Sequence, residues 1–70
     1  MEYQLQDGKI LYVQKMAAGD YCVFQKDETG ERTERCCHKM LPICTTFEAA
    51  QTKLKAFAQA RGLVMVSHEV

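Results

Sequence analysis

Residues 45–63 read TTFEAAQTKLKAFAQARGL, and this stretch decides the fold. Its start matches a capping box, in which the Thr45 side chain accepts a backbone hydrogen bond and Glu48 reaches back. Gly62 provides a left-handed stop, and Leu63 the hydrophobic contact of a Schellman ending. Between these ends, apolar side chains recur on one face at helical spacing, at Phe47, Ala50, Leu54, Phe57 and Ala58. The stretch therefore predicts one helix, about 25 Å long, with a single apolar side to bury.

The residues before this helix are typical of strands separated by tight turns. Asp7-Gly8 predicts a two-residue hairpin turn, because both residues tolerate positive φ. It joins residues 3–6 to the β-branched and aromatic run 9–15. A four-residue turn at 17–20 leads to a strand at 21–25, and a turn at 27–30 leads to a polar strand at 31–37, whose charges are typical of a sheet edge.

Residues 63–66 follow the helix and predict a short last strand beside an early one. The predicted fold class is α+β, an antiparallel β-meander of three to four strands followed by one α-helix packed on one sheet face and a short C-terminal strand. The order is ββββαβ, or βββαβ without the first strand. The chain is predicted to form a single domain over residues 1–70.

Both faces of the predicted sheet are apolar. With a four-residue second turn, Leu11, Val13, Cys22 and Phe24 share one face. The other face then carries Ile10, Tyr12, Tyr21 and Val23, joined by Tyr3 and Leu5. A three-residue loop with a bulge at the second turn shifts the register and mixes these sets.

One helix covers only one face of such a sheet. The face that bears the tyrosines is predicted to be the open one, because a tyrosine has an apolar body and a polar tip that tolerates water. An open apolar face often marks an association site. The sequence therefore predicts a surface for a protein partner or a homodimer, formed by Tyr12, Tyr21, Ile10 and Val23.

Bulk properties exclude several classes of protein. The chain has 70 residues, so it buries only about 60% of its unfolded surface and has a thin core. Nine basic residues balance nine acidic ones, which argues against a nucleic-acid binder with a basic excess. No segment approaches the roughly 18 apolar residues of a membrane span. Residues 1–8 lack the basic start and apolar run of a secretory signal, so a cytoplasmic location is expected.

The cysteines are the candidates for chemistry. A cytoplasmic location predicts thiols rather than disulfides. Cys36, Cys37, His38 and Cys44, with Cys22, suggest an alternative metal or redox site, but no C-x-x-C spacing is present. Cys44 lies just before the helix, where a helix dipole lowers a thiol pKa. Buried, inert thiols are the preferred interpretation. Since phosphate-binding loops and nucleophile elbows are also missing, we expect no catalytic residue, no metal, no cofactor and no enzyme activity.

Two resemblances add to this interpretation. The positions Thr46-Phe47-Glu48-Ala49-Ala50-Gln51, with Leu54, Phe57-Ala58 and Arg61-Gly62-Leu63, resemble the C-terminal half of small uncharacterised proteins carried on mobile elements of clostridia and relatives. That family implies no activity and no functional residue. In architecture alone, a sheet followed by a helix is similar to the N-terminal DNA-binding domain of conjugative-transposon integrases.

The second resemblance implies DNA binding through the sheet. The residues that would serve are Lys26, Arg32 and Arg35. Acidic residues such as Asp27, Glu31 and Glu34 interrupt them, so this role is the alternative and the protein-binding surface is preferred.

Overall fold

The computed structural model describes residues 2–36 and 38–66. The elements, in chain order, are β1 (Glu2–Gln4), β2 (Ile10–Lys15), β3 (Tyr21–Lys26), β4 (Thr33–Arg35), α1 (Phe47–Arg61) and β5 (Val64–Val66). The predicted order ββββαβ is thus confirmed, with a first strand that does form.

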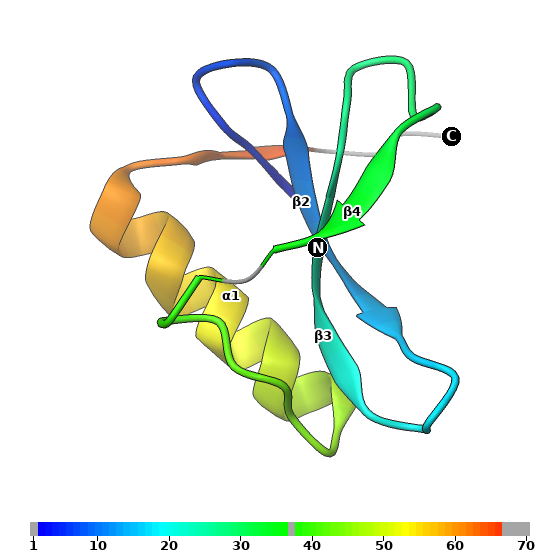
Figure 1. The fold of residues 1–70 in the computed structure, drawn as a ribbon. Coiled ribbons are helices and arrows are strands. Elements are labelled where there is room, and N and C mark those ends of the chain that lie inside the picture. The colour runs from blue at the N-terminus through cyan, green and yellow to red at the C-terminus, as the bar shows by residue number, and fades with distance from the viewer. Residues whose placement is uncertain (1, 37, 67–70) are drawn as a thin grey trace.

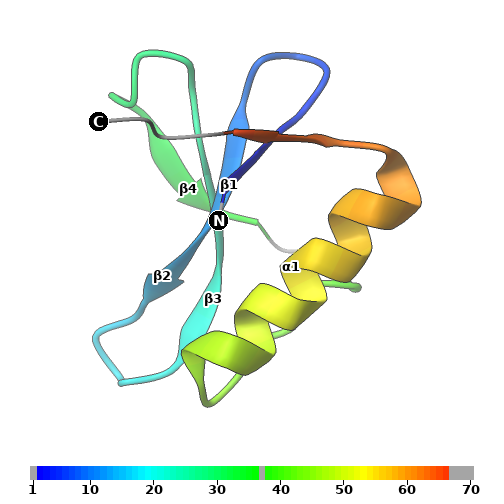
Figure 2. The ribbon, with the colours of Figure 1, turned by 180° about the vertical axis from the view of Figure 1, so that it is seen from behind.

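The strands form one antiparallel sheet in the order β4-β3-β2-β1-β5. The helix α1 crosses one side of this sheet and contacts β2 and β3, as Figures 1 and 2 show. After the helix the chain turns back, and β5 pairs with β1. The prediction that the last strand lies beside an early one is therefore correct, and β4 and β5 are the two edges of the sheet.

The helix begins one residue later than predicted. Thr46, not Thr45, has the extended backbone of a cap, and its hydroxyl accepts a hydrogen bond from the Ala49 backbone N–H at 3.1 Å. Glu48 is then the second helical residue, so it is not the reciprocal partner that a capping box requires. The end is as predicted: Gly62 is left-handed, and the backbone N–H of Leu63 donates to the Ala58 carbonyl at 2.9 Å.

The first two hairpins share one type of turn, and this type sets the register of the sheet. In the first, the Gly8 N–H donates to the Leu5 carbonyl, and the Leu5 N–H donates to the Lys9 carbonyl. In the second, Gly19, Met16 and Asp20 repeat this pattern. Each loop therefore has three residues and closes with a glycine at φ near +96°, as in a turn with a glycine bulge. The two-residue first turn and the four-residue second turn were wrong predictions.

The first loop is one residue longer than predicted, and the second is one residue shorter. Each difference shifts the adjoining strand by one residue, which reverses the faces of that strand relative to β2. Val13 lies opposite Val23, and Tyr3 opposite Leu11, so these four side chains share the side that α1 covers. We call this side the helix face. We call the other side the open face; by register it carries Glu2, Gln4, Ile10, Tyr12, Gln14, Cys22, Phe24, Lys26, Thr33, Arg35, Val64 and Val66, of which Cys22 is buried. The alternative that a bulged second loop shifts the register is the correct one.

The core lies between the helix face and α1. It is a cluster of buried side chains formed by Tyr3, Leu11, Val23, Leu41, Leu54, Phe57 and Ala58. Four of the five helix positions predicted to be buried are buried, but Phe47 is 44% exposed. Phe47 is the first helical residue, at the start of α1, and its ring packs in a T-shaped arrangement against the Tyr21 ring. Leu41, in the connection between β4 and α1, was not predicted as core.

Gly8 and Gly19 offer a matched test of the turns. Their φ values are +96° and +97°, where a side chain costs about 1–2 kcal/mol. The space that a Cβ would take is open at Gly19, whereas at Gly8 the Glu28 carboxylate occupies it. In urea unfolding we expect Gly19→Ala to lower the free energy of unfolding by about 1–2 kcal/mol and Gly8→Ala by somewhat more. Adding Glu28→Ala should remove the difference; a difference that persists would contradict the assignment to Glu28.

Candidate functional site

The structure separates the four residues predicted to form one partner surface. Ile10 and Tyr12 lie on the open face, as predicted. Val23 lies on the helix face and is 1% exposed within the core. Tyr21 is on the helix face too, opposite Lys15. Tyr21 and Val23 are therefore removed from the candidate surface, because the bulged second loop turns β3 over relative to β2.

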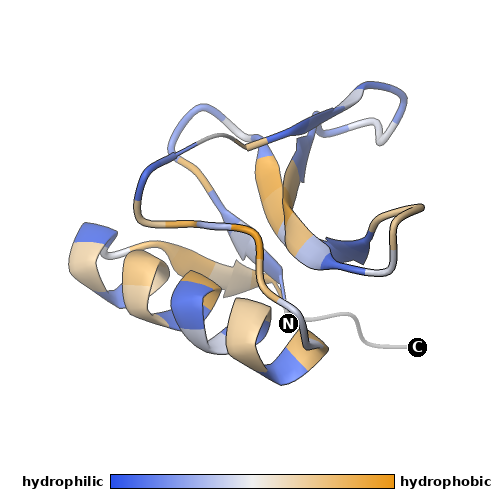
Figure 3. Ribbon diagram, turned by 60° about the horizontal axis from the view of Figure 1, so that its bottom comes forward, coloured by the Kyte–Doolittle hydropathy of each residue, from blue (hydrophilic) through white to orange (hydrophobic). Residues whose placement is uncertain are grey.

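Phe24 lies on the open face, where Tyr21 and Val23 were predicted to lie. It lies directly opposite Tyr12, and the two ring centroids are 6.2 Å apart. The strand β5 adds Val64 and Val66 to the same face, and Val64 is 70% exposed. Apolar side chains from three strands thus lie on a side that α1 does not cover, with Glu2 and Gln4 of β1 between the two valines and the residues of β2. In Figure 3 the central strands of the sheet carry the apolar colour.

An ion pair crosses part of this apolar surface. The Lys26 amine lies 3.5 Å from a carboxylate oxygen of Glu2 and 5.0 Å from the centre of the Tyr12 ring. To reach from β3 to β1, the lysine stem passes over Tyr12, and such a stem shields apolar surface while its charged end stays in water. The pair is partly exposed, so it contributes at most about 1 kcal/mol. A partner could displace it at little cost.

Tyr21 belongs to a different contact, at the end of the sheet near the start of α1. Its backbone exchanges two hydrogen bonds of 2.8 Å with Cys44, and its ring meets Phe47 at a centroid distance of 6.0 Å. These contacts hold the connection that leads into the helix against β3. The role of Tyr21 in the described structure is therefore to join sheet and helix.

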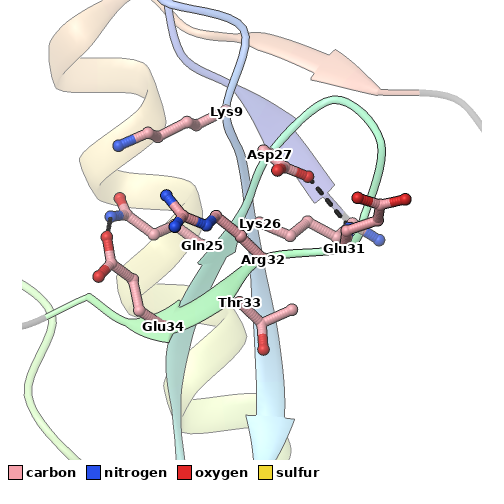
Figure 4. A pocket seen from close by; sticks show the side chains of 8 residues that line it. All are labelled: Lys9, Gln25, Lys26, Asp27, Glu31, Arg32, Thr33 and Glu34. Carbon is pink, nitrogen blue, oxygen red and sulfur yellow. Dashed lines mark hydrogen bonds between the residues drawn. The ribbon is translucent and has the colours of Figure 1, made fainter.

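The basic residues of the DNA alternative are divided between the two faces. Lys26 and Arg35 lie on the open face, opposite Thr33 and Phe24. Figure 4 shows Arg32 and Lys26 extending to opposite sides of the sheet. The shallow pocket around them is lined in equal number by basic and acidic residues, with two neutral ones: Lys9, Gln25, Lys26, Asp27, Glu31, Arg32, Thr33 and Glu34. Since this surface is balanced in charge, it lacks the basic stripe that binding to phosphates favours.

The turn beside this pocket is organised around Asp27. The Thr29 hydroxyl donates to the Asp27 carboxylate at 2.8 Å, and the Glu31 backbone N–H donates to the same oxygen at 3.1 Å. The hydrogen bond from Thr29, followed by those from the turn backbone, lowers the pKa of Asp27 below its usual value. The carboxylate is thus engaged in the turn rather than presented to a ligand.

The described cysteines do not form a metal site. Cys22, Cys36 and Cys44 are thiols, and no group of three His, Cys, Asp or Glu side chains that could hold a metal ion occurs in residues 2–36 and 38–66. Cys37 lies outside the described residues. Cys36 packs against the core cluster, whereas Cys44 pairs with Tyr21. This distribution does not bring the thiols to one point.

His38, which neighbours Cys37 in sequence, has a structural environment. Its ring lies 4.9 Å from the Phe57 ring, and one ring nitrogen lies 3.0 Å from the Arg61 guanidinium. The Met40 backbone N–H donates to the other ring nitrogen at 3.1 Å. The ring therefore ties the connection before α1 to the last turns of the helix, which explains its position without a catalytic role.

Comparison of the chain with protein-family models, with curated proteins and with solved structures found no match in any of the three. The described helix is neither long enough nor apolar enough to cross a membrane. The candidate site is therefore assigned from the arrangement of residues in the structure alone. It is the open face, and its apolar residues are Ile10, Tyr12, Phe24, Val64 and Val66. Phe24 and the two valines were missed in the sequence, where strand alternation with the correct turn length would have found them.

Proposed function

We propose that the protein is a non-enzymatic interaction module that binds a polypeptide partner through its open face. One observation carries the proposal: five apolar side chains lie on a sheet side that α1 leaves uncovered. Val64 is exposed, and the other four are partly exposed. Apolar residues that share one face mark association sites more often than the isolated apolar residues that every surface carries.

The composition of the face suits a polypeptide. Tyr12 and Phe24 are aromatic, and aromatic residues are enriched at the energetic centres of protein interfaces. The charged side chains of Glu2, Lys26 and Arg35 are interspersed with the apolar ones on this face, and Lys26 pairs with Glu2 across the Tyr12 ring. A partner with apolar groups and charges of both signs would complement this arrangement. A nucleic acid suits this face less well, because the Glu2 carboxylate beside Lys26 would repel its phosphate groups.

The proposal is tested by photo-crosslinking in the cells that produce the protein. A benzophenone amino acid replaces Ile10, on the open face, and in a second variant it replaces Lys53, which is exposed on α1. We expect a discrete polypeptide adduct from position 10 that position 53 does not give. Adding Tyr12→Ala should weaken the adduct roughly tenfold, since truncating a central aromatic residue costs more than 1 kcal/mol.

The circular dichroism spectrum of each variant serves as the control for folding. Equal adducts from positions 10 and 53, or none from position 10, would overturn the proposal. An adduct with nucleic acid instead of protein would favour the DNA alternative.

A further inference from the structure

The strand β5 is an apolar edge of the sheet. It is the last strand in the order β4-β3-β2-β1-β5, so one of its sides has no neighbouring strand among the described residues. Its sequence is Val64-Met65-Val66, and Val64 and Met65 are 70% and 54% exposed. Apolar side chains therefore border this edge on both faces: the two valines on the open face and Met65 on the helix face.

The hydrogen-bond alternation of the sheet shows which backbone groups of β5 point outward. Leu5 is hydrogen-bonded to Lys9, so Tyr3, two residues away, directs its backbone groups to Leu11. The neighbouring residues of β1 then direct theirs to Val64 and Val66. Met65, between these two, directs its N–H and C=O away from the sheet. A new strand would bond to Met65.

The other edge strand, β4, is protected against pairing with a strand of another chain. The strand β4 has the sequence Thr33-Glu34-Arg35, and all three residues are exposed. If two copies of β4 paired about a two-fold axis centred on Glu34, the two Glu34 carboxylates would lie opposite each other. Like charges directly opposite are destabilising, and charged edges are a common protection against pairing. The edge at β5 carries no charge, so the two edges differ in the property that governs self-pairing.

We propose that a second copy of this chain pairs with β5, antiparallel and centred on Met65. The Met65 N–H of each copy donates to the Met65 carbonyl of the other. Val64 then lies opposite Val66 of the second copy, at the close spacing of a pair without hydrogen bonds, where side chains are in contact. The paired segment contains no charged residue. The net charge of the chain is zero, so two copies do not repel each other as they approach.

The pairing deepens the proposed function and rests on it. Its two-fold axis is perpendicular to the sheet, so both open faces lie on the same side. The two copies form one continuous ten-strand sheet, which doubles the apolar surface offered to a partner. Because the paired strands are short, the interface is small and the dimer is weak, as is usual for interfaces below about 1,200 Å².

Sedimentation velocity over micromolar to millimolar concentrations tests the pairing. The wild type is expected to pass from monomer to dimer. Met65→Pro removes only an outward N–H, which an edge strand tolerates, yet it removes both reciprocal hydrogen bonds. It should raise the dissociation constant roughly tenfold or more. Met65→Leu keeps the N–H and should dimerise like the wild type. Tyr12→Ala, on the open face, should also still dimerise.

Charged substitutions on β5 test the pairing independently, in case the proline variant does not fold. In the double variant Val64→Lys with Val66→Lys, each lysine lies opposite a lysine of the second copy, so this protein should stay monomeric. The corresponding double glutamate variant should stay monomeric as well, and an equimolar mixture of the two should form a heterodimer. In the wild type, hydrogen exchange at the Met65 amide should slow as concentration rises.

A wild type that stays monomeric throughout, or a mixture that forms no heterodimer, would overturn the pairing. So would a dimer that Met65→Pro leaves intact and Tyr12→Ala abolishes, which would place the contact on the open face. None of these results affects crosslinking of another polypeptide at position 10, so the failure of the pairing and the failure of the proposed function are distinguishable.

Discussion

Leu54→Ala is expected to remove a large share of the free energy of unfolding. Leu54 is 0% exposed and lies in the cluster that joins α1 to the sheet. Truncation of such a leucine costs about 2–5 kcal/mol, because apolar contact is lost and a cavity remains. A 70-residue domain has only about 3.5–10 kcal/mol of stability in total. Urea unfolding monitored by circular dichroism would measure the loss.

The matched control is Lys53→Ala, one residue earlier in α1. Lys53 is exposed, so its truncation should change the free energy of unfolding by less than about 0.5 kcal/mol. If Leu54→Ala were as mild as the control, the packing of α1 on β2 and β3 would be wrong. The pair of variants thus tests which side of the helix is buried.

The second large effect concerns the two sides of the sheet. Val23→Glu is expected to prevent folding, because it places a charge in the core, where no cation lies opposite and the cost is several kcal/mol. Val23 faces Val13 and is 1% exposed. Ile10→Glu should fold, because Ile10 is on the open face, directly opposite Lys26.

Circular dichroism and urea unfolding of the two glutamate variants would provide the answer. In the register predicted from the sequence alone, Ile10 and Val23 share a face, and the two substitutions would behave alike. Equal outcomes would therefore contradict the observed register. A folded Val23→Glu variant combined with an unfolded Ile10→Glu variant would mean that α1 covers the other side.

The element order could be predicted because it depends on local chemistry. The spacing of Ala50, Leu54, Phe57 and Ala58 has a helical period, and Gly62 ends the helix as its missing side chain allows. The strands follow from β-branched and aromatic runs between turn residues. The final strand was expected beside an early one because connections are short, and it pairs with β1.

The faces of the sheet could not be predicted, because they depend on a choice of one residue at each turn. Asp7-Gly8 fits a two-residue turn and also the last two positions of a three-residue turn, and both require positive φ at Gly8. The strand β2 offers no help, since Ile10 and Tyr12 are as apolar as Leu11 and Val13. Tyr21 and Val23 were therefore assigned to the wrong face, whereas Ile10 and Tyr12 do lie on the open face.

Leu41 escaped prediction for a related reason. It stands in an aperiodic segment that precedes Pro42, where no repeat reveals which side chains turn inward. In the structure it is 3% exposed and belongs to the core cluster. A non-repeating connection can supply a core residue that pattern analysis does not detect.

The bulged loops at Gly8 and Gly19 have a consequence for how this sequence can change. Both faces of β2 are apolar, so the hydrophobic pattern alone does not determine which face packs against the helix. The lengths of the loops before and after β2 determine it. Deleting or inserting one amino acid in either loop would invert the adjoining strand and exchange buried for exposed positions along it. Exchanges of one apolar residue for another on the strands would be tolerated more readily than any change in the length of these two loops.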